Sequence, residues 1–313
     1  MKSLIKKTIR LGAKLAAPLL YAKFFLHKKS PLSKGRVCLT FDLDLPKDYE
    51  KTPALLDQLS AFSFHGTFGI IGKWLERYPR VHKRMLDEGH EIMNHTYSHP
   101  NNEVFNPDRY FNQLSVAQQE AEVIGFEKTC HRILGYKPVG FRTPHFGDLN
   151  TESIYGILEK RNYLYSTSAM MTRTRSGGVP FFPKRGQFDR PGQGEEAYGV
   201  LEMPVACCPV HYFPTMDSVH CVRQETPAHP GNSFFEIFTQ SVHQGLDRKL
   251  VSIYDFGPQD VGGSDTFDRM LEFLRRNRVA TVTCREAADA YLKAAGKAEK
   301  TEIGKTKKDV VEK

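Results

Sequence analysis

Two histidines and two aspartates stand directly after short apolar segments of the chain. His95 and His99 follow residues 91–94, and this spacing lets two imidazoles share a metal ion if they lie on one helical turn. A lone pair at this spacing also arises by chance on many helices. The position favours a metal site, because the pair comes at the carboxyl end of a predicted barrel strand, where the active sites of barrel enzymes are built.

Asp42 and Asp44 end another predicted strand, residues 37–41. Two carboxylates this close are costly unless a positive charge lies beside them. One could bind a metal ion while the other acts as a base; otherwise they are a helix N-cap and a solvated loop charge. Arg142, at the end of predicted strand 139–142, either forms a surface ion pair or holds Asp42 ionised and oriented.

Apolar runs and helical periodicity alternate from residue 36 onward. Strands are predicted at 37–41, 67–71, 91–94, 139–142, 163–167, 200–205, 250–254 and 279–282, and helices at 52–62, 73–88, 107–134, 151–160, 232–244, 266–277 and 286–295. Such alternation implies parallel strands with helical crossovers. About seven such units indicate an α/β fold closed into a (β/α) barrel.

The chain reads as one domain, residues 35–295, because no shift in composition divides it. Residues 172–198, rich in Gly, Pro and Arg, are predicted as a loop insertion at one barrel end. Its arginines and aromatics suit an acidic or lipid-linked sugar, and they equally suit a solvated loop with no function. Residues 296–313 form a charged tail.

Residues 1–34 are a basic amphipathic segment. Their longest apolar run, 15–22, is interrupted by Pro18 and is shorter than the roughly 20 residues that cross a bilayer. No small-residue cleavage site follows, so we expect no secretory signal. Two interpretations stay open: peripheral association with an anionic membrane, or a surface helix covering the bottom of the barrel.

The net charge and the cysteines limit which kinds of partner and which cellular compartment we expect for this protein. The net charge of +8 favours an anionic partner, but no nucleic-acid-binding module or aromatic-basic pattern is present, so nucleic acid is excluded. The six cysteines have no CxxC spacing, which predicts reduced thiols and no cysteine zinc site. Cys207 and Cys208, near His211, could suggest a second metal site, but adjacent cysteines have poor geometry as ligands, so we interpret them as inert thiols. We therefore expect a cytoplasmic protein, membrane-associated if the N-terminal segment binds lipid.

Three segments together resemble a known family. Thr40-Phe-Asp-Leu-Asp44, His90 to Pro100 and Phe141-Arg-Thr-Pro144 resemble, in order and spacing, the first three motifs of the polysaccharide deacetylases, the NodB-like or chitin-deacetylase-type carbohydrate esterases. The resemblance covers residues 36–291. It implies a distorted (β/α) barrel with seven or eight strands and an Asp-His-His site for a divalent metal, usually Zn²⁺.

Carried over to this sequence, the family's roles fall on five residues. The resemblance makes Asp44, His95 and His99 the metal ligands, Asp42 the general base and Arg142 its orienting partner. Such a site leaves a position for a water molecule whose pKa the metal lowers. A backbone N–H near Phe146 would help to stabilise the oxyanion.

The proton donor departs from the family pattern. The resemblance leads us to expect a histidine at the end of a late strand, with an aspartate partner, and this chain has Asp255 there. Asp255 is our first candidate if burial beside another carboxylate raises its pKa, and His145 and His211 are alternatives. The plain alternative is a strand-end aspartate that caps the following loop.

The expected function is metal-dependent hydrolysis of an N-acetyl or related acyl group from a carbohydrate or envelope polysaccharide. Two alternatives stay open: a deformylase or deacylase of a lipid-linked sugar or a non-sugar amide, and a non-catalytic glycan-binding homologue. The presence of a predicted base beside the predicted metal site argues against the last, since pure binding requires no base.

Overall fold

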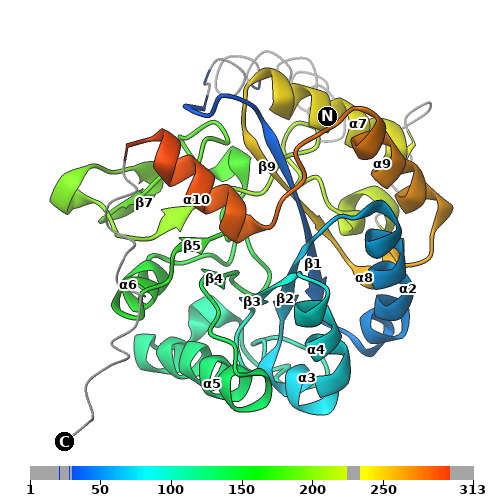
Figure 1. Ribbon diagram of the computed structural model, residues 1–313. Helices are drawn as coiled ribbons and strands as arrows, with labels where there is room; N and C mark the ends of the chain where they lie inside the picture. The colour runs from blue at the N-terminus through cyan, green and yellow to red at the C-terminus, as the bar shows by residue number, and fades with distance from the viewer. Residues whose placement is uncertain (1–20, 22–27, 29, 224–232, 297–313) are drawn as a thin grey trace, which may run out of the picture.

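Seven parallel strands form the centre of the molecule (Figure 1). The computed structural model describes residues 21, 28, 30–223 and 233–296. The strand order is β8-β5-β4-β3-β2-β1-β9. The strands are β1 Arg36–Leu43, β2 Thr67–Ile70, β3 Glu91–Asn94, β4 Gly140–Phe141, β5 Tyr165–Ser166, β8 Leu201–Glu202 and β9 Val251–Phe256. Val205, just beyond β8, also bridges to Ile253 of β9, so the curled sheet closes on itself.

Helices cover the outside of this sheet (Figure 1). They are α2 Pro46–Phe62, α3 Gly72–Arg77, α4 Pro79–Asp87, α5 Val116–Leu134, α6 Glu152–Lys160, α7 Phe234–Asp247, α8 Pro258–Val261, α9 Asp265–Arg276 and α10 Cys284–Ala294. The segment between β5 and β8 carries an antiparallel hairpin of β6 Pro183–Lys184 and β7 Gln187–Pro191. The predicted insertion 172–198 therefore includes a small sheet of its own.

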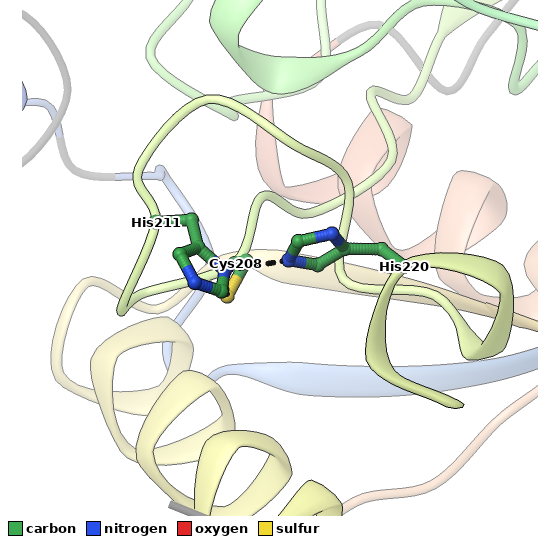
Figure 2. A group of neighbouring side chains, drawn as sticks. All are labelled: Cys208, His211 and His220. Atoms are coloured by element: carbon green, nitrogen blue, oxygen red, sulfur yellow. Dashed lines mark hydrogen bonds between the residues drawn. The ribbon is translucent and has the colours of Figure 1, made fainter. Parts of the chain in front are cut away.

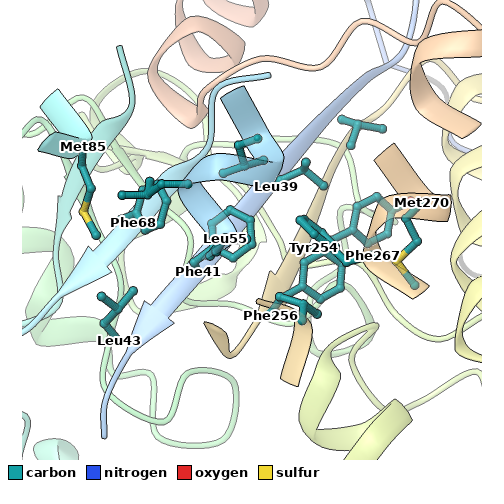
Figure 3. Close-up of a cluster of buried hydrophobic side chains, with 14 of the residues drawn as sticks. Leu39, Phe41, Leu43, Leu55, Phe68, Met85, Tyr254, Phe256, Phe267 and Met270 are labelled. Carbon is teal, nitrogen blue, oxygen red and sulfur yellow. The ribbon is translucent and has the colours of Figure 1, made fainter. Parts of the chain in front are cut away.

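Side chains along β1 alternate between the apolar core under the helices and the inside of the barrel, where the candidate site lies. Leu39, Phe41 and Leu43 point outward and pack under α2 and α9, in the cluster drawn in Figure 3. Cys38 belongs to a second apolar cluster, which also holds Met93 and Ile253. Because successive strand residues face opposite ways, Thr40 and Asp42 share the face of Cys38 and point into the barrel.

Several predicted elements differ from the structure; the helix predicted over 52–62, for example, begins at Pro46. The helix predicted over 107–134 begins at Val116, because Ser115 caps it by accepting from Gln118 N and Gln118 returns the bond. The helix predicted over 73–88 breaks at Pro79, which starts α4 instead of continuing α3. The strand predicted over 279–282 is reduced to a single bridge between Thr281 and Val37.

The N-terminal segment lies largely outside the described residues. Of the part that is described, Tyr21 is buried and its hydroxyl donates to Gln244, while Leu32 is buried in the second apolar cluster. Residues 30–34 thus pack on the barrel. No helix among the described residues is long and apolar enough to cross a membrane.

Candidate active site

Asp44 is fixed by the backbone bonds around it. It follows β1, and its carbonyl accepts from the indole of Trp74 and the amide of Asn102, both at 2.9 Å. Its own N–H and that of Leu45 donate to Asp48 Oδ2 at 3.1 and 2.9 Å. Because the backbone is tied on both sides, the Asp44 carboxylate has a defined position at the carboxyl end of the barrel.

His95 and His99 meet through an irregular turn instead of a helix. His95 N donates to Ile70 O, which extends the ladder of β3 by one residue. Thr96 and His99 then take left-handed backbone angles, with φ of 69° and 50°. Asn94 Oδ1 accepts from Thr96 N, and Thr96 Oγ1 accepts from His99 N. The two histidines therefore do not lie on one helical turn, yet this irregular turn places their ring centroids 4.8 Å apart.

The two imidazoles converge on the Asp44 carboxylate. Asp44 Oδ1 lies 3.4 Å from His95 Nε2 and 3.5 Å from His99 Nε2. Asp44 Oδ1 and His99 Nε2 are buried and have no hydrogen-bond partner among the described residues. Buried polar atoms that go unpaired are costly, so their convergence is typical of a site for a cation.

His95 is oriented as metal-binding histidines usually are. Its Nδ1 lies 2.9 Å from the carbonyl oxygen of Arg142, which can only accept. A proton on Nδ1 donates to this carbonyl, which leaves Nε2, the nitrogen that faces Asp44, as the atom that can bind a metal ion. This donor set of one carboxylate and two imidazoles fits zinc or a similar divalent metal.

The carboxylates of Asp42 and Asp44 make the surroundings of the two histidines negatively charged, which favours a bound cation. Burial lowers the pKa of His95, but the carboxylates of Asp42 and Asp44 outweigh it and raise the value to about 9. Burial lowers the pKa of His99 to about 3. A proton on His95 thus supplies, in the metal-free protein, the positive charge that the two carboxylates require.

Arg142 joins the carboxylates into one network. It is fully buried at the end of β4, and its Nη1 donates to Asp42 Oδ1 at 3.0 Å and to Asp255 Oδ1 at 2.6 Å. Nη2 donates to Thr40 Oγ1 and Nε to the carbonyl of Thr167. A guanidinium held by four bonds orients Asp42 rigidly, with its Oδ2 3.8 Å from His95 Nε2.

Asp255 lies beside Asp42 at the end of β9, opposite Thr40 in the ladder. Burial, reinforced by the charge of Asp42, raises the pKa of Asp255 well above its ordinary value, although Arg142 opposes the shift. The carboxyl group therefore keeps a proton more readily than a solvated aspartate does. Its role as the proton donor stays a prediction.

The other two candidate donors occupy different places. His145 is exposed, and its ring packs edge-on to His99 with centroids 4.8 Å apart. His211 instead lies against Cys208 and His220. The structure thus brings His145, but not His211, into contact with the Asp44 group.

Sequence reasoning missed Asp48, whose carboxylate holds the Asp44 loop. Its Oδ1 also accepts from Gln259 N, so it ties the loop after β1 to α8, the helix that follows β9. The only signal in the sequence is an acidic residue in the first turn of a helix, which is common. Its positioning contacts are visible only in three dimensions.

The insertion lies beside a hollow away from this site. A cavity of about 450 Å³ is lined by insertion residues such as Phe181 and Phe182 and by Tyr291 of α10. Of the insertion's basic residues, Arg173, Lys184 and Arg185 form ion pairs with Asp148, Glu196 and Glu159. These pairs favour the interpretation of a solvated surface for those three side chains.

Comparisons with known proteins concern the first half of the chain most directly. Residues 29–163 match the sequence model of a family described as polysaccharide deacetylase. A peptidoglycan-N-acetylglucosamine deacetylase of Bacillus cereus is 42% identical over 123 residues, 39% of this chain and 41% of that protein. A peptidoglycan-N-acetylmuramic acid deacetylase of Bacillus subtilis is 34% identical over 116 residues, 37% of this chain and 22% of that protein. The chain thus spans less than half the length of either relative.

Solved structures share the fold over most of the chain. A crystal structure from Mycobacterium smegmatis, assigned to the polysaccharide deacetylases, has a TM-score of 0.64 at 16% identity and covers 86% of this chain and 94% of its own. A Bacillus anthracis protein described as a CE4 family pseudoenzyme has a TM-score of 0.53 at 16% identity and covers 84% of this chain and 68% of its own. These likenesses confirm the predicted barrel and, at such identities, extend to the fold alone.

Proposed function

We propose that this chain is a metal-dependent polysaccharide deacetylase that removes an N-acetyl group from an envelope glycan, because residues 29–163 match the model of that family. One observation carries the proposal: the ligand atoms of Asp44, His95 and His99 converge beside a second carboxylate, Asp42, that a buried arginine orients. The peptidoglycan substrates in the names of the two relatives support the choice of glycan.

Asp44, His95 and His99 would hold the metal ion, and we propose zinc for this donor set. When bound, such an ion lowers the pKa of a water molecule and polarises an acyl oxygen. Asp42 would accept the proton from the attacking water, because Arg142 leaves its second oxygen directed toward the ligand group. Arg142 would hold Asp42 in this orientation through its bond to Asp42 Oδ1.

Asp255 would supply the proton to the leaving amine. Its carboxyl group shares Arg142 with Asp42. When Asp42 takes up a proton and loses its charge, the repulsion that raises the pKa of Asp255 is removed, and Asp255 can release its own proton. Two carboxyl groups on one guanidinium favour a state in which one is ionised and one protonated.

A fold likeness alone does not make an enzyme, since one solved neighbour is described as a pseudoenzyme. The glycan-binding alternative therefore needs a direct test. We would incubate the zinc-loaded protein with N-acetylglucosamine oligomers, peptidoglycan fragments and a formamido sugar, and measure acetate and formate. We expect acetate release from an N-acetylated glycan and at least about 100-fold less from the Asp42→Asn variant. Tight zinc binding without acyl release from any of these sugars would favour the binding protein instead.

A further inference from the structure

A second group of metal-ligating side chains lies apart from the proposed active site. Cys208, His211 and His220 each offer one ligand atom, and these atoms lie within 4.8 Å of one another. Figure 2 shows the three side chains directed toward a common point from two segments of the chain. The inference drawn from them is independent of the proposed function.

Backbone hydrogen bonds fix the first two members of this group. Cys208 N donates to Pro214 O, and Tyr212 N donates back to Cys208 O, both at 2.8 Å. These bonds close a tight loop after β8 and place His211 one turn beyond Cys208. The thiol and the imidazole are thus held on the same side of the loop, with Cys208 Sγ 3.6 Å from His211 Nδ1.

The third member comes from the next segment. His220 lies on the short helical turn Val219–Arg223, and its N–H donates to Asp217 Oδ1 at 2.6 Å. Its Nε2 lies 2.7 Å from His211 Nδ1. Asp217 is itself buried, so this bond anchors the helical turn in the interior next to the group.

The distances are close to those of a tetrahedral zinc site. With Zn–S of about 2.3 Å and Zn–N of about 2.05 Å, sulfur and nitrogen would be about 3.6 Å apart and the two nitrogens about 3.3 Å apart. The first separation is already present, at 3.6 Å. The second requires the two rings, now 2.7 Å apart at their nitrogens, to part by about 0.6 Å.

We propose that Cys208, His211 and His220 form a second metal site, for zinc or a metal of similar ligand preference. A thiolate and two imidazoles are the ligands that such metals favour over magnesium or calcium. Three protein ligands leave the fourth position for water or another small ligand.

This site corrects our interpretation of the cysteines as unconnected with metal. The adjacent thiols do not act together: Cys207 Sγ points to the hydroxyl of Tyr21 and the sulfur of Met171, and only Cys208 faces the histidines. The missing ligand was His220, nine residues after His211. A bound ion would join the loop 207–215 to the helical turn, next to Asp217, which bridges to Asp255 at the end of β9.

Cobalt distinguishes the two metal sites, because a thiolate bonded to Co²⁺ gives a near-ultraviolet charge-transfer band that carboxylate and imidazole ligands do not. We would strip the full chain with a chelator, keep its thiols reduced, and titrate Co²⁺ while recording absorbance. We expect two ions per chain, with the sulfur band saturating at one of them, and displacement of that band by Zn²⁺.

Variants assign the band to its residue. Cys208→Ser and His220→Gln should each abolish the band and lower the count to one ion per chain. Cys221→Ser, which changes a thiol of the same helical turn outside the group, should keep it, and so should the His95→Gln, His99→Gln double variant. Circular dichroism checks that each variant is folded. A folded wild-type protein that binds Co²⁺ with no sulfur band, or a band that survives Cys208→Ser, would overturn the second site.

Discussion

Asp255 is the residue on which the proposed mechanism depends and which the family pattern predicts least well. The late strand that would end in a histidine ends here in a carboxyl group that shares Arg142 with Asp42. Burial raises the pKa of Asp255, which is the change that a proton donor requires. The exposed His145, beside His99, is the alternative donor.

The two candidates can be separated by the leaving group. We expect Asp255→Asn to lower kcat on an N-acetyl glycan by about 100-fold or more, because the amine must be protonated as it leaves. The same variant should lose much less on a nitrophenyl acetate, whose leaving group needs no proton. His145→Gln serves as the matched variant. A selective loss in His145→Gln, with Asp255→Asn affected equally on both substrates, would move the role to His145.

The lowered pKa of His82 should make the stability of the protein depend on pH. It is buried in α4 against the hydroxyl of Tyr49, and burial lowers its pKa from 6.5 to about 3. Between these values the unfolded chain binds a proton that the folded chain does not, so the free energy of unfolding falls as the pH falls. The expected slope from this group is at most about 1.4 kcal/mol per pH unit.

Urea unfolding between pH 7 and pH 4 measures this slope. We expect His82→Gln to be less stable at pH 7 and to have a shallower pH dependence than the wild type. His131→Gln, an exposed change on α5, should leave the slope unchanged. An unaltered slope in a folded His82→Gln variant would show that other groups cause the acid sensitivity.

At the scale of elements, β2 makes room for the carboxylate on β1. Gly69 lies opposite Asp42 in the parallel ladder, and a Cβ at Gly69 would overlap Asp42 Oδ1. The carboxylate cannot move away freely, because Arg142 holds that same oxygen. The glycine is thus a requirement of the site and not of the strand.

Gly69→Ala should therefore reduce activity more than stability. We expect kcat to fall at least about 10-fold, since a small displacement of the base suffices. Gly156→Ala is the matched control: this helix position in α6 has Tyr198 as its nearest neighbour at 3.9 Å, so alanine should stabilise the protein by about 0.5–1 kcal/mol. Activity equal to that of the wild type in Gly69→Ala would contradict the assigned position of Asp42.

The sequence was informative where the signal is local. The strands from β1 to β3 and the order of the motifs could be predicted, because apolar runs and the ends of strands are visible in the residues themselves. The start of α5 could not be predicted, because the helical periodicity extends back to residue 107 while the Ser115 cap begins the helix at Val116. The Asp48 clamp and the ligand His220 were missed, since their contacts join segments that the sequence does not pair. The metal-binding roles of Asp44, His95 and His99 stay predictions.

At the scale of the whole molecule, the basic N-terminal segment is the part of the chain that we propose binds a membrane surface. Tyr21 is anchored against Cys207 and Gln244, which joins the end of this segment to the barrel. The charge carried by residues 1–20 suits an anionic lipid surface. Peripheral membrane binding of a cytoplasmic protein is our proposal for this segment.

Flotation with vesicles tests this proposal. We expect the full chain to float with vesicles containing phosphatidylglycerol and to remain behind with phosphatidylcholine alone, because the attraction is electrostatic. Removal of residues 2–20, which keeps Tyr21, should abolish flotation, and about 1 M salt should weaken it strongly. Equal flotation with and without these residues would show that residues 2–20 do not bind the vesicles.

The central claim is that Asp44, His95 and His99 hold the ion that makes the glycan acyl group reactive. Its most direct test is the rate of acetate release from an N-acetylated glycan, measured while zinc is added back to the metal-free Cys208→Ser variant. This variant removes the proposed second site, so a single ion per chain should restore activity from the baseline to its full value. A rate that is already full in the metal-free protein, or that stays at the baseline when one ion is bound, would contradict the account.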